Sequence, residues 1–243
     1  NRGNIIHAGL EKILSQGLDC TDEELHQRVV AFGETQLAYF YGDEEPPASA
    51  KRYFELLMKK IESLLLLFRK EFAASQFRPV AFEVNVGIGD RPVESVKIPL
   101  EYGTVSLVGK VDRVDLFEKD GKKYLRVVDY KTGEKTFSFD LVNNGIDIQM
   151  LMYLYALQQN FYPGQDCYPA GVQYVGANPK TVKASRNEND DSVLLKWEKN
   201  LPRSGVYLKD ATVINAMDNT ARMQAPSAAH LFGTDNYGRD IFS

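Results

Sequence analysis

The chain has 243 residues, 44% of them hydrophobic, and a net charge of -4, which fits a single domain with one sizeable core. Its mildly acidic charge gives no support for strong nonspecific binding to nucleic acid, because lysine and arginine make the phosphate contacts. Cys20 and Cys167 lack C-x-x-C partners and indicate neither a disulfide framework nor a zinc site. The longest apolar run, Leu64 to Phe68, is far below the roughly 20 residues of a membrane span, and no signal peptide is visible, so we expect a cytoplasmic protein.

The first part of the chain predicts helices. Apolar residues around His7 have helical spacing. Thr21, followed directly by acidic residues, predicts the capped start of a helix that continues to about Tyr41. After a break at residues 42–47, an apolar stripe from Ser49 to about Ser75 predicts a long second helix.

The residues that follow favour strands, with a short helix near the end. Runs of β-branched and aromatic residues predict strands near Val80–Gly87, Val96–Leu100, Ser106–Phe117, Tyr124–Lys131 and Gly171–Val175. We expect Glu83, in the first of these strands, on the solvent side. A polar loop is predicted at residues 187–191 and a helix at residues 210–217. The pattern predicts an α/β (α+β) fold with a central mixed β-sheet flanked by helices.

The hairpin between the third and fourth predicted strands brings two carboxylates together. Asp120-Gly121 is a strong signal for a tight turn. If the turn is centred there, facing residues have numbers that sum to 241, so Asp112 faces Asp129. Facing side chains have Cβ atoms roughly 5 Å apart, and like charges there are destabilising unless something neutralises them. A divalent cation is the obvious candidate, although a bulge would break this register.

Lys131 adds a cation to the same place. It lies two residues after Asp129, so strand alternation puts both side chains on one face. Mg²⁺ held by carboxylates polarises a phosphate and acidifies a water, and a lysine can position that water or stabilise developing charge. The sequence therefore indicates phosphodiester hydrolysis. The alternative is an exposed hairpin with scattered charges, which Asp-x-Lys alone does not exclude.

Two further side chains have weaker support from their own context. Gln149 and Tyr153 are four residues apart and share a helix face, but an ordinary buried helix with a polar rim explains them equally well. His7 lies on an apolar helix face, where a lone histidine is usually a core residue. A small basic set, Lys180, Lys183 and Arg186, fits a DNA contact or a solvated loop.

Five motifs in order resemble a known family. They are Arg2-Gly3-Asn4-Ile5-Ile6-His7, Gly109-Lys110-Val111-Asp112-Arg113-Val114-Asp115, Val128-Asp129-Tyr130-Lys131-Thr132-Gly133, Gln149-Met150-Leu151-Met152-Tyr153, and Ser204-Gly205-Val206-Tyr207-Leu208 leading to Ala216-Met217-Asp218. With these motifs the chain resembles the RecB-like branch of the PD-(D/E)XK nucleases, most closely the C-terminal nuclease domain of AddB-type helicase-nuclease subunits. The resemblance implies a restriction-endonuclease-like core with an N-terminal helical portion.

The resemblance also implies a role for each motif residue. Metal ligands are expected at His7, Asp112 and Asp129, with the backbone carbonyl of Tyr130 assisting. Lys131 matches the catalytic lysine, and Gln149 and Tyr153 complete the catalytic set of Asp112, Asp129 and Lys131 from a helix. Contacts to nucleic acid are expected from Lys110, Arg113 and Tyr153.

The implied activity is Mg²⁺- or Mn²⁺-dependent cleavage of DNA by an exonuclease. Its substrate would be single strands fed by an AddA-like helicase-nuclease partner in double-strand-break repair. One alternative is a stand-alone RecB-like or Cas4-like exonuclease. Another is a degenerate nuclease fold that serves as a DNA-binding scaffold, although facing carboxylates have no purpose there.

The chain departs from the family in its cysteines and its tail. AddB-type domains hold an iron-sulfur cluster with cysteines that flank the nuclease motifs, and this chain lacks them, so we expect no cluster here. The nuclease-like region is expected at residues 1–223, with a helical front at about 1–77, a catalytic core at 78–177 and a mixed region at 178–223. Residues 224–243 resemble a segment of oligopeptide-transporter permeases, and we interpret them as a tail of non-native origin and the chain as a fragment.

Overall fold

A computed structural model describes residues 2–90, 92–133, 135–178, 201 and 203–217, together with Lys183, Ser185, Asn187, Asn189, Ser192, Val193 and Lys196. The predicted tail at 224–243, most of the polar loop at 187–191, and Lys180 and Arg186 lie outside the described residues. Two compact units divide the chain. The first contains residues 2–70, 131–133 and the described part of 177–201, and the second contains the other described residues.

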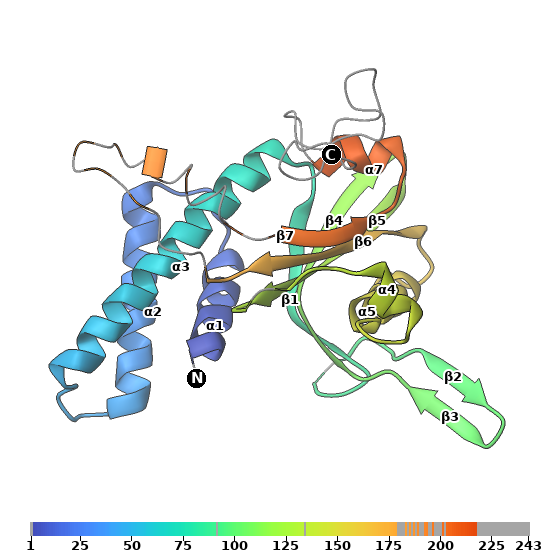
Figure 1. The fold of residues 1–243 in the computed structure, drawn as a ribbon, viewed down its shortest axis with the longest axis horizontal. Coiled ribbons are helices and arrows are strands. Elements are labelled where there is room, and N and C mark those ends of the chain that lie inside the picture. The colour runs from blue at the N-terminus through green and yellow to red at the C-terminus, as the bar shows by residue number, and fades with distance from the viewer. Residues whose placement is uncertain are drawn as a thin grey trace. The chain divides into compact units, whose positions relative to one another are not determined.

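The first unit is built from three helices, α1 (Arg2–Leu14), α2 (Asp22–Tyr41) and most of α3 (Ala48–Ala74) (Figure 1). The predicted cap of α2 is confirmed: Thr21 and Glu24 form a capping box, in which each side chain bonds to the backbone N–H of the other residue. The apolar stripe predicted for α3 is also confirmed. No helix among the described residues is long and apolar enough to cross a membrane.

Small residues allow these helices to approach closely. A Cβ atom added to Gly9 of α1 would lie 2.8 Å from Ile61 of α3 and 2.9 Å from Phe32 of α2. A Cβ atom on Gly33 would lie 2.8 Å from Met58. Around these contacts lies a core of buried side chains that includes Ile6, Leu10, Ile13, Leu25, Val29, Leu57, Leu64, Leu65 and Phe68. Tight packing of this apolar surface stabilises the unit.

The second unit is organised around a five-stranded sheet with the strand order β1-β4-β5-β6-β7 (Figure 1). Its strands are β1 (Arg78–Val86), β4 (Gly109–Lys119), β5 (Lys122–Lys131), β6 (Cys167–Gly176) and β7 (Arg203–Tyr207). β7 contains most of the fifth motif, for which no strand was predicted. The described fold confirms the predicted α/β class with a mixed central sheet.

The strand predicted at Ser106–Phe117 is two strands in the structure. β3 (Gly103–Ser106) pairs with β2 (Lys97–Leu100) in a separate two-stranded hairpin, and β4 begins only at Gly109. The hairpin extends away from the five-stranded sheet in Figure 1. The apolar residues Leu107 and Val108 join the two strands, which is why the sequence pattern showed no interruption.

The register predicted for the β4–β5 hairpin is confirmed. Asp120 and Gly121 have positive φ angles of 51° and 75°, as expected for the central residues of a tight hairpin turn. Lys119 pairs with Lys122 and Arg113 with Val128, so facing residues have numbers that sum to 241.

Helices of the second unit pack on opposite faces of the sheet. Helix α5 (Gln149–Asn160) contributes Met150, Tyr153, Leu154, Ala156 and Leu157 to a core with Val114, Leu125, Val127 and Val172. Helix α7 (Ala211–Met217) packs through Val213, Ala216 and Met217 against Phe77, Phe117, Tyr124 and Ala170. A short helix, α4 (Phe139–Asn143), was not predicted. Because side chains alternate along a strand, α5 covers the face to which Asp112 and Asp129 belong.

Candidate active site

Asp112 of β4 and Asp129 of β5 lie on neighbouring strands at one level of the sheet. The last pair of the β4–β5 ladder is Arg113 with Val128, and one further step in the same register sets Asp112 opposite Asp129. The backbone N–H of Tyr130 donates to Oδ2 of Asp112 over 2.7 Å. One oxygen of Asp129, Oδ2, is buried. The facing carboxylates predicted from the turn are therefore consistent with the strand geometry.

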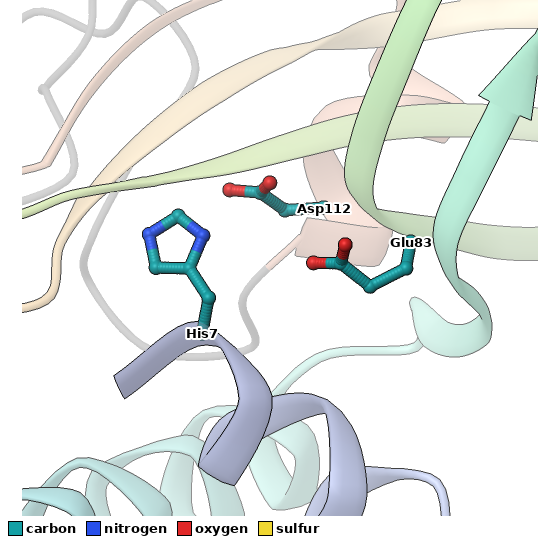
Figure 2. A group of neighbouring side chains, drawn as sticks. All are labelled: His7, Glu83 and Asp112. Atoms are coloured by element: carbon teal, nitrogen blue, oxygen red, sulfur yellow. The ribbon is translucent and has the colours of Figure 1, made fainter. Parts of the chain in front are cut away.

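Glu83 of β1 places a third carboxylate at this level. The β1–β4 ladder pairs Val84 with Val111, and the next step sets Glu83 across from Asp112. One carboxylate oxygen of each residue lies within 4.8 Å of the other, and Figure 2 shows both side chains. The prediction that Glu83 faces solvent was wrong, because its side chain is only 20% exposed. Glu83, Asp112 and Asp129 thus form a row of carboxylates across β1, β4 and β5, named here the carboxylate row.

The backbone at Glu83 explains why the sequence did not reveal its position. Glu83 has a φ of 49°, a left-handed conformation that a residue other than glycine rarely adopts. Such a conformation interrupts the alternation on which the sequence prediction relied. An ion pair joins Glu83 to Lys110, which begins β4 beside Gly109. Strained backbone of this kind persists where the surrounding structure holds it, and it is found preferentially at functional sites.

His7 belongs to the first unit, where it lies on α1 with an intermediate exposure. Figure 2 draws its imidazole together with the two carboxylates. Its helix is confirmed, and its predicted role as a metal ligand stays a prediction. Lys131, at the end of β5, likewise keeps the predicted position in its strand, and its catalytic role remains a prediction.

Helix α5 brings Gln149 and Tyr153 to the beginning of β4. Nε2 of Gln149 donates to the hydroxyl oxygen of Tyr153 over 2.7 Å. A Cβ atom added to Gly109 would lie 1.7 Å from that same hydroxyl oxygen, so Tyr153 lies directly against the backbone of Gly109. Only glycine fits there, three residues before Asp112. The predicted contact of Tyr153 with nucleic acid is not supported, because the side chain is buried and instead fixes Gln149.

A cluster that no sequence pattern indicated adjoins Asp129. Burial raises the pKa of Tyr174 in β6 to about 12, and the negative charges of Asp129 and Asp147 raise it further. Tyr174 therefore keeps its proton near neutral pH. Lys135 forms an ion pair with Asp147, and its Nζ atom lies 5.7 Å from the centre of the Tyr174 ring. Asp147 has a φ of 59° and lies just before α5, so the pair holds the approach to Gln149.

A correction concerns the predicted contacts with nucleic acid. Arg113 is completely buried, and its guanidinium group contacts Asp115 and Tyr130. A side chain in that position cannot reach a phosphate, so the predicted contact of Arg113 was wrong. Lys110 is different, because its side chain is 54% exposed despite its ion pair with Glu83. Its contact with nucleic acid stays a prediction.

The donor atoms of the carboxylate row suit a hard divalent cation. Mg²⁺ and Mn²⁺ prefer carboxylate oxygen ligands, whereas sites for softer metals use thiolate or several imidazole groups. Three carboxylates on adjacent strands repel one another, and a cation bound between them would relieve that repulsion. The residues present therefore fit such an ion.

Comparison with known proteins decides the family. The family model of the PD-(D/E)XK nuclease superfamily matches residues 1–229. The chain belongs to this superfamily. The resemblance inferred from the five motifs is thereby confirmed, and the Asp129-x-Lys131 pattern at the end of β5 lies inside the matched region.

Individual relatives point to one kind of protein within the superfamily, named as the second of the subunits that form an ATP-dependent helicase/deoxyribonuclease. The chain is 33% identical over 170 residues to the one from Clostridium acetobutylicum, an alignment that covers 68% of this chain and 15% of that protein. The relative from Clostridium botulinum (strain Loch Maree / Type A3) is 35% identical over 181 residues, with 70% and 15% covered. The relative from Caldanaerobacter subterraneus subsp. tengcongensis is 32% identical over 174 residues, with the same coverage. The aligned region spans only about 15% of the length of these relatives.

Proposed function

We propose that this nuclease domain is a divalent-metal-dependent deoxyribonuclease, an exonuclease that hydrolyses phosphodiester bonds in single-stranded DNA. The observation that carries the proposal is the carboxylate row, in which Glu83 and Asp112 approach within 4.8 Å and Asp129 follows in the strand register. Three acidic side chains at one level of a sheet, in a nuclease of this superfamily, are best explained by a bound cation.

Asp112 and Asp129 would hold Mg²⁺ or Mn²⁺, with the carbonyl oxygen of Tyr130 as the further ligand that the sequence resemblance implies. His7 remains a proposed ligand on the same basis, and Glu83 is one that we add from the structure. When bound, the cation would withdraw electron density from the scissile phosphate and make the attacking water more acidic. Asp112 is already oriented for this task, because the N–H of Tyr130 fixes one of its oxygens.

The remaining residues would act directly on water, substrate or each other. Lys131, two residues beyond Asp129 in β5, is proposed to orient the attacking water and to stabilise negative charge on the phosphate. Gln149 presents its amide from the first turn of α5, held by the hydroxyl of Tyr153. Tyr174 keeps its proton beside Asp129, because burial raises its pKa. It is therefore available as a hydrogen-bond donor.

The substrate and partner are proposed from the names of the relatives. Those proteins are named as subunits of an ATP-dependent helicase/deoxyribonuclease, and this chain aligns with a small part of each. A nuclease domain in such an assembly would receive single strands from an AddA-like helicase partner during double-strand-break repair. The mildly acidic charge of this chain agrees with delivery of DNA by a partner, since it gives little nonspecific affinity of its own.

Cleavage of a labelled single strand tests the proposal. The purified chain is incubated with an end-labelled oligonucleotide in millimolar Mg²⁺ or Mn²⁺, or with a chelator. Cleavage should require the metal and should be lost in Asp129→Ala. Lys131→Ala should bind Mn²⁺ nearly as well as the wild type but cleave roughly 10²-fold more slowly, as expected for a group that acts on the reaction itself.

Lys119→Ala provides the matched control, because Lys119 is an exposed lysine at the far end of the same hairpin. It should cleave at the wild-type rate. Metal-independent cleavage, or equal rates in Lys131→Ala and Lys119→Ala, would contradict the mechanism. Tight binding of DNA without any cleavage would favour the scaffold alternative, and cleavage of duplex ends or RNA at a higher rate would overturn the preference for single-stranded DNA.

A further inference from the structure

Arg113 uses all of its guanidinium nitrogens inside the second unit. Nε lies 2.8 Å from Oδ1 of Asp115, and one terminal nitrogen donates to Oδ2 of the same carboxylate over 3.0 Å. The other terminal nitrogen donates to the hydroxyl oxygen of Tyr130 over 2.9 Å. The guanidinium group also lies over the ring of Phe72, 5.3 Å from its centre. Arg113 is therefore fixed in one orientation.

The network continues away from Tyr130 through alternating charges. Arg126 donates to Oδ2 of Asp115 over 2.6 and 3.0 Å and lies 3.5 Å from a carboxylate oxygen of Glu71. The other oxygen of Glu71 pairs with Arg203 of β7 over 2.9 Å. Burial would raise the pKa of Glu71, but the guanidinium groups of Arg203, Arg126 and Arg113 hold that pKa below its ordinary value. Glu71 therefore stays charged.

This network and the carboxylate row lie on opposite faces of the same strands. Arg113 follows Asp112 in β4, and Tyr130 follows Asp129 in β5, so strand alternation separates their side chains from the carboxylates. Tyr130 nevertheless belongs to both sets. Its hydroxyl accepts from Arg113 on one face, while its backbone N–H donates to Asp112 on the other.

We propose that Arg113 and Tyr130 act as positioning residues, which fix the backbone of β5 so that the main chain of Tyr130 meets Asp112 in the geometry that the metal requires. This inference rests on the proposed function, because it names what sets the accuracy of the same centre. Neither side chain touches substrate or metal. They act through the main chain of Tyr130, whose amide orients one ligand and whose carbonyl oxygen is proposed as another.

The chemistry of the pair supports positioning over plain stabilisation. A buried ion network contributes little net stability compared with apolar side chains of similar volume, because removing charges from water is costly. Its hydrogen bonds, however, have strict directions. Arg113 can hold Asp115 and Tyr130 at once only because the guanidinium group is a planar fork, which the single ammonium group of a lysine cannot reproduce. The anchored ring leaves the strand little freedom to slide.

Tyr130→Phe tests the inference with the smallest possible change, since it removes only the hydroxyl group. Mn²⁺ affinity is measured by calorimetry on the folded chain, and thermal unfolding is recorded in parallel. We expect Mn²⁺ to bind about tenfold more weakly, in line with the loss of an outer partner of a metal ligand. Tyr124→Phe is the matched control, because Tyr124 is a buried tyrosine on the same face of β5, at the far end of the strand. It should bind Mn²⁺ like the wild type.

Arg113→Lys provides a second variant, which keeps the positive charge but loses the fork, and it should weaken Mn²⁺ binding to a similar extent. A merely structural role predicts something else, namely lower melting temperatures in both variants with unchanged Mn²⁺ affinity of the folded protein. That outcome would overturn the inference.

Amide hydrogen exchange at position 130 gives a readout that needs no metal. The N–H of this residue is bonded to Asp112 in the wild type, and Tyr130→Phe should exchange it several-fold faster, whereas Tyr124→Phe should leave its rate unchanged. If the wild type takes up no Mn²⁺, the proposed metal centre fails, and this exchange rate alone decides the positioning role. An unchanged rate in Tyr130→Phe would then reject it.

Discussion

The two faces of the five-stranded sheet carry charges at alternating positions of the same strands, but the two sets of charges differ in balance and in burial. On one face Glu83, Asp112 and Asp129 bring three negative charges to one level of the sheet, with side chains of intermediate exposure. On the other face Arg113 and Asp115 are completely buried, and guanidinium and carboxylate groups contact one another directly.

The difference shows that charge balance, more than charge itself, distinguishes a candidate site from a structural network. Buried arginine and aspartate side chains that pair with each other need no ligand. Carboxylates of one sign on adjacent strands repel each other, and the fold tolerates them because something outside the chain can bind there. Each face can be perturbed separately, which turns the comparison into experiments.

The largest effect on stability is expected on the buried face. Asp115→Ala would leave the guanidinium groups of Arg113 and Arg126 buried without their shared carboxylate, at a cost of about 3 to 5 kcal/mol in the free energy of unfolding. Urea denaturation measures this cost. Asp166→Ala, at an exposed position of the same unit, should change the free energy of unfolding by less than about 0.5 kcal/mol. Similar losses in the two variants would show that the buried pairing is not special.

A smaller effect on stability, with a specific effect on activity, is expected where α5 meets β4. Gly109→Ala forces a methyl group against the hydroxyl of Tyr153 and should destabilise the fold by about 1 to 3 kcal/mol. The displaced Tyr153 no longer holds Gln149, so cleavage measured with a labelled oligonucleotide should fall by roughly 10²-fold. Gly103→Ala, where an added Cβ meets no atom within 4 Å, is the control. Full activity in Gly109→Ala would remove Gln149 and Tyr153 from the site.

The smallest effect is expected from relieving the repulsion in the carboxylate row. Asp129→Asn removes one negative charge and should raise the stability of the metal-free chain by about 1 kcal/mol at neutral pH. Millimolar Mn²⁺ should then raise the melting temperature of the wild type but hardly that of Asp129→Asn, because a ligand stabilises only the state that binds it. Differential scanning fluorimetry measures both shifts. Equal shifts in the two proteins would exclude Asp129 as a ligand.

The hairpin that carries Asp112 and Asp129 could be predicted because its signals are local. Asp120-Gly121 fixes the turn, and the turn fixes the register over the whole ladder from Lys119 to Arg113. The helices α2 and α3 were predicted for similar reasons, since a capping box and a long apolar stripe are read from consecutive residues. Their bounds differ from the predictions by one or two residues.

Features that depend on distant segments could not be predicted. The position of Glu83 follows from a left-handed backbone angle that no neighbouring residue announces. Arg113 looked like a surface cation, and only its partner Asp115 and the ring of Phe72 show that it is buried. The contact between Gly109 and Tyr153 joins positions 44 residues apart in the sequence, so its tightness is visible only in three dimensions.

The β2–β3 hairpin has a consequence for how the chain can be cut or rearranged. All eight residues of its two strands are exposed, and Tyr102 between them is 93% exposed. Two strands without a covered face have marginal stability of their own. A protease such as chymotrypsin should therefore nick the chain after Tyr102 long before it attacks the five-stranded sheet. The same place is suited to new chain termini in a circular permutant, because β1 and β4 are paired along their length and do not need this covalent link to remain neighbours.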